Sequence, residues 1–269
     1  MMNVLVDAHC HIGKYPDRDG TVKRARAAGI RPIVATSRPS EFRDLIELFG
    51  MNADLDIGLG FHPECAGSVY VPTEIEIFNE YVGRARWISE IGLDGLIADS
   101  TSSHFGNIPT LDEQVALFRA VLDRAGSGKV YSIHSRGAAS LTMDVLDEFS
   151  IDHVVLHSFS GTLGEARRAV ERGFYFSIHP AMVSTSEGRS IVNWLPIDRM
   201  LIETDGPYFA WHDRPIEPSD YREIVAEVSR TRRTDSRDLL DQLGRNYLTL
   251  TGVATGSAPV TQVPDDFEG

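Results

Sequence analysis

Cysteine is scarce in this sequence: its 269 residues contain only Cys10 and Cys65. Two cysteines cannot supply the disulfide framework that stabilises small secreted proteins, so we expect a protein of the reducing cytoplasm. A chain of this length buries roughly 70–75% of the surface that its unfolded state exposes. We therefore expect it to fold without a disulfide or a structural metal ion.

Long apolar runs are missing as well. No stretch approaches the ~18 consecutive apolar residues of a membrane-spanning helix, which predicts that the protein does not enter a membrane. The opening segment, Met1 to Asp7, also lacks the basic flank and apolar region of an export signal.

Basic residues are outnumbered: 26 lysines and arginines stand against 39 aspartates and glutamates, for a net charge of −13. This balance argues against a protein that coats nucleic acid through a basic face. It does not exclude an enzyme that binds phosphate through metal ions, because such ions dominate the local electrostatic field. The apolar fraction of 42% and the charged fraction of 24% are those of an ordinary globular protein.

Short β-branched runs alternate with amphipathic stretches along the chain. We predict strands at Val4–Asp7, Pro32–Ala35, Asp56–Gly60, Trp87–Glu90, Val130–Ile133, Val154–Leu156, Phe174–Ser177 and Met200–Glu203. We predict helices at Glu41–Phe49, Thr73–Val82, Thr110–Ala125, Leu141–Phe149, Leu163–Arg172, Ser219–Arg230 and Ser236–Thr249.

Strand–helix alternation of this kind requires parallel strands, because each helical crossover returns the chain to the same end of the sheet. Eight such units predict a single (β/α)8 TIM barrel over residues 1–252. A Rossmann fold would have G-x-G-x-x-G after the first strand, where this chain has His9 to Gly13. Residues 253–269 lack hydrophobic periodicity, and we expect them to form a flexible, disordered tail.

Six of the nine histidines follow or end predicted strands, at the end of the barrel where such enzymes have their active sites. A carboxylate stands at the end of two further strands. These residues are His9 and His11 (strand one), His62 (three), Glu90 (four), His134 (five), His157 (six), His179 (seven) and Asp205 (eight).

Each of these residues alone has an ordinary structural explanation. A lone strand-end histidine is commonly a hydrogen-bonded core residue, Glu90 could form a salt bridge with an arginine, and Asp205 could be a turn residue. Four histidines and two carboxylates at one barrel mouth are instead the mixed nitrogen and oxygen set that suits Zn²⁺, Mn²⁺ or a similar cation.

Ordered motifs in the chain resemble those of the TatD family, metal-dependent deoxyribonucleases built on amidohydrolase-like TIM barrels. The resemblance covers roughly residues 3–252 and rests on the segments Asp7-Ala8-His9-Cys10-His11, Gly60-Phe61-His62-Pro63, Ser89-Glu90-Ile91-Gly92-Leu93-Asp94, Ile133-His134-Ser135-Arg136, His157-Ser158-Phe159-Ser160-Gly161 and Glu203-Thr204-Asp205.

The resemblance implies a ligand set for the metal site, with His62 facing the substrate and Asp94 supporting a ligand from behind. The implied metal ligands are His9, His11, Glu90, His134, His157 and Asp205. It also implies hydrolysis of DNA.

The chain departs from the family pattern in its substrate-facing loops. Ser89 stands where the family usually has a glycine before the glutamate. Glu64 stands where it usually has a histidine or another residue with a polar ring after His-Pro. Arg214–Pro218 stands where the family has an Arg-Asn-Glu-Pro motif. The segment from His11 to Pro16 is similar to TatD-like components of Qat-type anti-phage gene clusters, which implies a role, with protein partners, in defence.

From the ligand set we predict phosphodiester hydrolysis by two divalent cations, Zn²⁺, Mn²⁺ or Mg²⁺, about 3.5–4 Å apart. We expect His9, His11 and Asp205 at one ion, and His134 and His157 at the other. Glu90 would bridge the ions, and Asp205 would also take the proton from the attacking water, so both carboxylates are predicted to be catalytic.

Two arginines are candidates for substrate contacts. Arg136 lies two residues past His134 and could contact a phosphate oxygen or form a surface ion pair. Arg214 lies with Tyr208, Phe209 and Trp211 in the loop after strand eight, where the rings could stack on bases or pack as a lid. A recessed mouth favours single strands or strand ends over intact duplex.

Two alternatives remain open. The first is a hydrolase of a small amide, lactone or phosphoester. Many binuclear enzymes of that kind bridge their metals with a carboxylated lysine on strand four, whereas this chain has only Lys14, Lys23 and Lys129, none of them at that place. The second is a subunit without catalytic activity, in which replacing Glu90 or Asp205 would leave biological activity intact.

Overall fold

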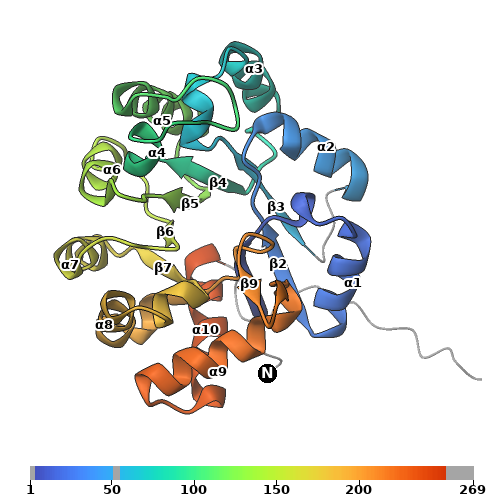
Figure 1. The fold of residues 1–269 in the computed structure, drawn as a ribbon, viewed down its shortest axis with the longest axis vertical. Helices are drawn as coiled ribbons and strands as arrows, with labels where there is room; N and C mark the ends of the chain where they lie inside the picture. The colour runs from blue at the N-terminus through green and yellow to red at the C-terminus, as the bar shows by residue number, and fades with distance from the viewer. Residues whose placement is uncertain (1–3, 51–54, 253–269) are drawn as a thin grey trace, which may run out of the picture.

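The structure is a computed structural model that describes residues 4–50 and 55–252. Eight parallel strands close into a barrel in the order of the sequence (Figure 1). They are β1 (Leu5–Cys10), β2 (Ile30–Val34), β3 (Asp56–Gly60), β4 (Trp87–Gly92), β5 (Val130–His134), β6 (Val154–His157), β7 (Tyr175–Ile178) and β8 (Met200–Ile202). The predicted (β/α)8 TIM barrel is confirmed. The tail predicted over 253–269 lies outside the described residues.

Helices form the outer layer of the described chain (Figure 1). They are α1 (Arg18–Ala27), α2 (Pro39–Phe49), α3 (Val71–Tyr81), α4 (Gly95–Ala98), α5 (Leu111–Ala125), α6 (Ala139–Leu146), α7 (Leu163–Glu171), α8 (Ser186–Trp194), α9 (Tyr221–Arg232) and α10 (Ser236–Thr251). Short 3-10 helices lie at η1 (Ile12–Lys14), η2 (Pro63–Gly67), η3 (Pro180–Val183), η4 (Ile197–Arg199) and η5 (Pro218–Asp220).

All seven predicted helices are present, with their ends shifted by a few residues. The sequence prediction missed α1, α4 and α8. The buried face of α1 consists of Thr21 and Ala25, which are too small and too polar to produce an apolar stripe. Helix α8 contains Gly188, a residue that disfavours helix interiors.

The barrel interior and the helix layer take alternate residues of the same strands. Val6 and Ala8 of β1 belong to the inner cluster, together with Trp87 and Tyr247, whereas Leu5 packs outward in the cluster that the helices cover. This division follows from the two-residue period of a β-strand, which sends successive side chains to opposite faces.

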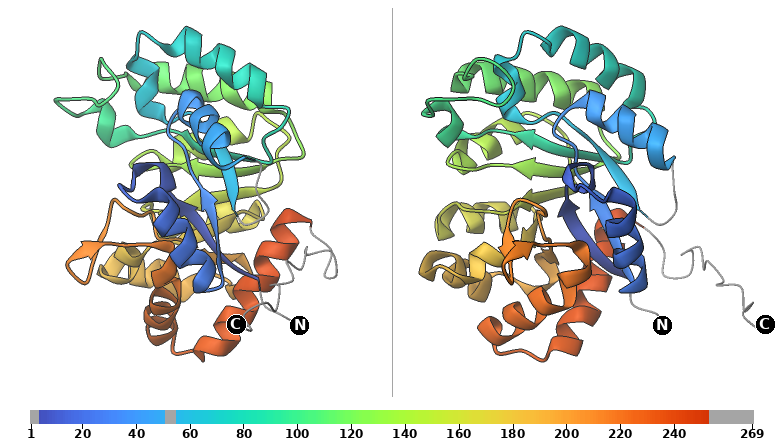
Figure 2. Two further views of the ribbon diagram at one scale, coloured as in Figure 1. Left: turned by 90° about the vertical axis from the view of Figure 1, so that its right-hand side faces the viewer. Right: turned by 45° about the vertical axis from the view of Figure 1, so that its right-hand side comes forward.

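The two ends of the barrel differ in what covers them. Helix α10 packs across the amino end, where Asn246 donates hydrogen bonds to the carbonyl groups of Ile197 and Met200 at 2.7 and 2.8 Å. Figure 2 shows α10 at the end opposite the loop that follows β8. That loop contains a small hairpin of β9 (Ala210–Trp211) and β10 (Arg214–Pro215) and lies at the carboxyl end.

No helix among the described residues has both the length and the apolar character that crossing a membrane requires.

Candidate metal centre

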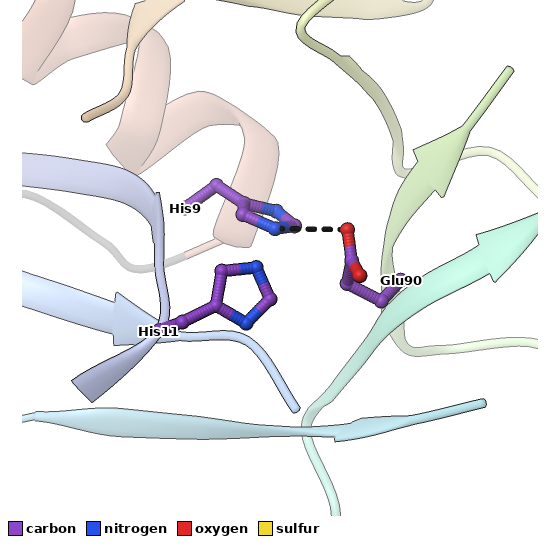
Figure 3. Close-up of side chains that lie close together, drawn as sticks. All are labelled: His9, His11 and Glu90. Carbon is purple, nitrogen blue, oxygen red and sulfur yellow. Dashed lines mark ion pairs between the residues drawn. The ribbon is translucent and has the colours of Figure 1, made fainter. Parts of the chain in front are cut away.

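The carboxyl ends of the strands bring the six predicted metal ligands together. Each of the six has a side-chain nitrogen or oxygen within 4.0 Å of an atom of another. Figure 3 shows three of them, with His9 and His11 from the β1 side pointing toward Glu90 of β4. Residues separated by up to 196 positions in the sequence, His9 and Asp205, therefore meet at one mouth.

Glu90 is the centre of this cluster. Its Oε1 lies 3.3 Å from Nε2 of His9 and 3.2 Å from Nε2 of His157. Nδ1 of His134 is 3.9 Å from the same oxygen, and Nε2 of His62 is 3.8 Å from Oε2. A buried carboxylate between four imidazoles is a suitable ligand for a divalent cation.

Asp205 forms the open side of the cluster. Its Oδ1 lies 3.4 Å from Nε2 of His11 and 4.0 Å from Nε2 of His9. The Asp205 side chain is 22% exposed, whereas that of Glu90 is 7% exposed. Of the two carboxylates, Asp205 is therefore the more accessible to water and substrate.

Irregularities in two strands point the central side chains inward. Between Asp7 and Cys10, β1 has one residue more than its partner β2, and β4 has one more than β5 between Ile88 and Ile91. Such β-bulges redirect side chains and are frequent next to active sites. His9 lies in the first bulge and Glu90 in the second, and these two side chains face each other across the mouth.

Both carboxylates of the centre have left-handed backbone conformations, with φ of 51° at Glu90 and 52° at Asp205. Residues other than glycine seldom adopt this region, which costs of order 1–3 kcal/mol. The surrounding structure maintains both conformations, and strain of this kind is commonly concentrated at functional sites.

Three of the histidines are held from behind by a polar side chain. Nδ1 of His9 lies 2.9 Å from Oγ of Ser132, and Nε2 of His134 lies 2.8 Å from Oδ2 of Asp94. Nδ1 of His157 faces Oε1 of Glu203 at 3.6 Å. The carboxylate of Asp94 can only accept, so Nε2 of His134 carries a hydrogen and Nδ1 is the nitrogen left to bind a cation.

His62 has the opposite arrangement. Its Nδ1 accepts a hydrogen bond from the backbone N–H of Glu64 at 3.2 Å, so in the neutral ring the hydrogen is on Nε2. That Nε2 is the atom that faces Glu90. His62, Glu90 and His134 lie close enough to share a cation, but the hydrogen on Nε2 makes His62 a donor toward the site.

The carboxylates at the mouth are held in their charged forms. Burial opposes the ionisation of Asp205, but His11 and the neighbouring imidazoles outweigh it and lower its pKa to about 2. Burial is likewise outweighed at Glu90, whose pKa the surrounding histidines hold well below its ordinary value. Two buried negative charges among imidazole nitrogens form an environment that favours a cation.

The residues of the mouth fit a metal ion on two counts. Nε2 of His9 is buried, lies 3.3 Å from Glu90, and has no hydrogen-bond partner among the described residues. Sets of three ligand atoms within 4.8 Å of one another include His9, His11 and Glu90, and also His9, His157 and Asp205. No lysine competes for the bridging position: Lys129 donates to the carbonyl groups of Val82 and Ala85, near the amino end.

The two predicted substrate arginines differ in how they are held. Nη1 of Arg136 lies 3.9 Å from Oδ2 of Asp94, and 56% of the Arg136 side chain is exposed beside the mouth. Arg214 is engaged by Asp220, with Nη1 and Nη2 at 2.9 and 2.6 Å from its two oxygens. Arg136 therefore has more freedom than Arg214 to reach a bound phosphate.

A groove of about 580 Å³ opens near the loops that follow β5 and β6. It runs between the loops after β5 and β6 and the first turns of α8, and its walls include Ser160, Thr162, Glu165 and Glu187. Oε1 of Glu165 accepts a hydrogen bond from the backbone N–H of Ser140 at the start of α6. The two carboxylates make this groove a poor place for a phosphate group.

The sequence prediction gave no role to the partners behind the rings, Ser132 and Glu203. Glu203 is fully buried, and besides facing His157 it accepts a hydrogen bond from Ser177. The signal for Glu203 was present in the sequence, since it is an acid at the end of the apolar strand β8, like Glu90 in β4. Ser132 gave no such signal. Asp94, predicted as a supporting residue, does contact His134.

A barrel with buried histidines and carboxylates at its carboxyl mouth defines a class, the metal-dependent hydrolases of the TIM-barrel type. The family model described as "TatD related DNase" matches residues 6–252. The chain therefore belongs to the TatD-related DNase family, as the sequence motifs predicted.

Two named relatives and one solved structure of this family are similar to the chain along most of its length. The chain is 29% identical to human deoxyribonuclease TATDN3 over 83% of this chain and 87% of the relative. It is also 29% identical to the 3'-5' ssDNA/RNA exonuclease TatD of Citrobacter koseri, over 88% and 94% of the two chains. Among solved structures, the TatD homologue YjjV of Escherichia coli K12 matches with a TM-score of 0.73 at 25% identity, covering 93% of this chain and 98% of that one.

Proposed function

We propose that this protein hydrolyses phosphodiester bonds of DNA, in single strands or at strand ends, with two divalent cations held at the barrel mouth. The observation that carries the proposal is the convergence of six predicted ligand side chains, with Glu90 at the centre of the other five, inside a barrel of the TatD-related DNase family. Relatives named as a deoxyribonuclease and as an exonuclease of single-stranded DNA and RNA support the choice of substrate.

We propose the same division of ligands that the sequence suggested. His9, His11 and Asp205 would hold one cation, in keeping with the short distances from Asp205 to both histidines. His134 and His157 would hold the other, since their facing nitrogens are 3.1 Å apart. Oε1 of Glu90 lies between the two groups, which suits a bridging carboxylate.

Bound cations supply a nucleophilic water at neutral pH and neutralise charge on the phosphoryl oxygens. The protein's own residues would do the remaining work. Asp205, which is ionised and is the more exposed of the two carboxylates, would receive the proton of the attacking water. His62 would donate from Nε2 to a phosphate oxygen, and Arg136 would contact a phosphate from the rim.

The alternative of a small amide or lactone as substrate is less well supported. Glu90 rather than a lysine lies among the histidines at the mouth, and relatives are named as nucleases. A subunit without activity is also disfavoured, because Ser132, Asp94 and Glu203 still stand behind three of the ligand rings.

The test combines elemental analysis of the purified chain with a nuclease assay. End-labelled single-stranded DNA is incubated with the metal-free protein and with added Mn²⁺, Mg²⁺ or Zn²⁺. We expect cleavage only with metal, and about two metal ions per chain. Single-stranded, blunt duplex and tailed duplex DNA, with RNA as a further arm, then define the preferred substrate.

Paired variants make the test specific for the mouth. Glu90→Gln removes the central charge, and activity should fall on the order of 10³-fold or more, because groups that act as a unit fail together. Glu74→Gln is the matched control: Glu74 is also a buried glutamate, but it binds Ser40 instead of the mouth. A metal-loaded protein that leaves DNA intact but cleaves a lactone or amide would overturn the proposal.

We further propose that this hydrolase acts in the cytoplasm within an anti-phage defence system and has protein partners there. This rests on the likeness of the segment from His11 to Pro16 to components of such systems. The test is phage plating on cells that carry the gene cluster with the wild-type gene or with Glu90→Gln. Equal plaque counts on the two would refute a catalytic role in defence.

A further inference from the structure

His179 and His62 follow strands on opposite sides of the closed barrel. His179 follows β7, which lies four strands away from β3 in the closed eight-stranded barrel. Ser177, two residues earlier, points into the barrel interior and donates a hydrogen bond to Glu203. Because alternate residues of a strand share a face, His179 projects into the mouth on the same side as Ser177.

The backbone fixes which nitrogen of His179 carries the hydrogen. His179 precedes η3 and accepts at Nδ1 from the backbone N–H of Ala181 at 3.1 Å. A backbone N–H can only donate, so the neutral ring carries its hydrogen on Nε2. His62 has the same arrangement in its own His-Pro turn, accepting at Nδ1 from the N–H of Glu64.

The Nε2–H group of His179 has no acceptor in the part of the chain that the structure describes. Only 6% of the residue is exposed, and Nε2 is buried without a hydrogen-bond partner among the described residues. Leaving a buried donor unsatisfied costs stability, and native structures seldom do so without a functional reason. The edge-to-face contact with Phe209, with ring centroids 4.9 Å apart, holds the imidazole in this orientation.

We propose that His179 binds the substrate's phosphate group through its Nε2–H, as a neutral donor facing the donor of His62 across the metal centre. The proposal rests on the proposed function for the nature of the substrate. A phosphodiester presents two non-bridging oxygens, and donors on opposite strands of the barrel are placed to hold such a group from both sides. A neutral donor adds this contact without adding a positive charge that would compete with the cations.

The alternative is that His179 only shapes the turn after β7. Three substitutions separate the two roles. His179→Asn keeps an acceptor for the N–H of Ala181 but does not reach the position of Nε2. His179→Gln places an amide nitrogen near that position, and His179→Phe keeps the ring packed on Phe209 without any donor. His153→Asn, at the exposed start of β6 near the amino end, is the control.

Two readouts are needed, on protein shown to contain wild-type amounts of metal and to melt at the wild-type temperature. The first is the binding of inorganic phosphate to the metal-loaded protein, and the second is kcat and KM on single-stranded DNA. We expect Asn and Phe at position 179 to weaken phosphate binding and to lower kcat/KM on the order of 10–100-fold, as for a lost hydrogen bond to a charged group. The His179→Gln variant should retain a large part of both the phosphate binding and the kcat/KM of the wild type.

Phosphate binding tests the inference separately from DNA cleavage. If the wild type cleaves no DNA but the Asn and Phe variants lose phosphate binding, the proposed substrate fails and the role of His179 stands. If the wild type cleaves DNA and all three variants bind phosphate and turn over normally, the role of His179 is refuted. If the Asn, Gln and Phe variants lose phosphate binding and kcat/KM equally, His179 only shapes the turn after β7. That result would also refute its proposed role in phosphate binding.

Discussion

Buried polar groups at the two ends of the barrel differ in what they contact. At the amino end, Lys129 and Asn246 each donate to two backbone carbonyl groups, so their polar atoms are used within the fold. At the mouth, nitrogens of His9, His11 and His179 have no hydrogen-bond partner among the described residues. Other buried side-chain atoms in that condition include Nε1 of Trp87 at the start of β4 and Nε of Arg232 at the end of α9.

This difference separates what holds the fold from what is kept for a ligand. A satisfied polar group contributes to one native arrangement, and an unsatisfied one lowers stability until something binds. The amino end therefore behaves as structure and the mouth as a site. Substitutions at the two ends should accordingly have separable consequences.

Among residues that support the ligands from behind, the largest effect is expected from Asp94→Asn. Asn keeps the oxygen that caps α4 but turns an amide N–H₂ group toward Nε2 of His134. His134 would then have to move its hydrogen to the nitrogen that faces Glu90. We expect metal affinity or activity to fall about 10–100-fold, measured by metal titration and by the DNA assay. Unchanged metal affinity would contradict the role of Asp94 behind His134.

Metal binding should stabilise the wild type and leave Glu90→Gln largely unaffected. A ligand present at 100 times its dissociation constant adds about 2.7 kcal/mol to the free energy of unfolding. For a chain of this size that corresponds to a rise of very roughly 5–10 °C in Tm. Differential scanning fluorimetry with and without Mn²⁺ or Zn²⁺ measures it. An equal rise in wild type and Glu90→Gln would mean that the cation binds elsewhere.

At the amino end, Asn246→Ala should lower stability and spare activity. The substitution leaves the carbonyl groups of Ile197 and Met200 without their donor in a buried place. We expect a loss of about 1–3 kcal/mol in the free energy of unfolding, seen in urea denaturation. Below the melting transition, kcat/KM should match the wild type. A fall in kcat/KM of the folded variant would show that the two ends are coupled.

The fold could be predicted from the sequence because its signals are periodic. Helix α5 illustrates this, with apolar residues at helical spacing and Gly126 ending it at φ of 68°. The positions of the metal-binding candidates could be predicted for the same reason, since once the strands are placed their last residues must meet. Helix α1 lacked that periodicity and was missed.

The finer features of the mouth could not be read from the sequence. A β-bulge depends on how two strands pair, so nothing local to His9 or Glu90 announced the extra residue in each strand. The hydrogen positions on His62 and His179 depend on the backbone of the following turns. A strand-end histidine therefore looked the same whether it offered a lone pair or a hydrogen.

The bulges at His9 and Glu90 also bear on how this enzyme could be made more robust. Deleting one residue from either bulge would let the strand pair without interruption, and the barrel would become more regular. The same deletion would leave a single residue between Asp7 and Cys10, or between Ile88 and Ile91, so His9 or Glu90 would lose the local geometry that now points its side chain into the mouth. Gains in thermal tolerance are thus better sought at the helical rim than by straightening β1 or β4.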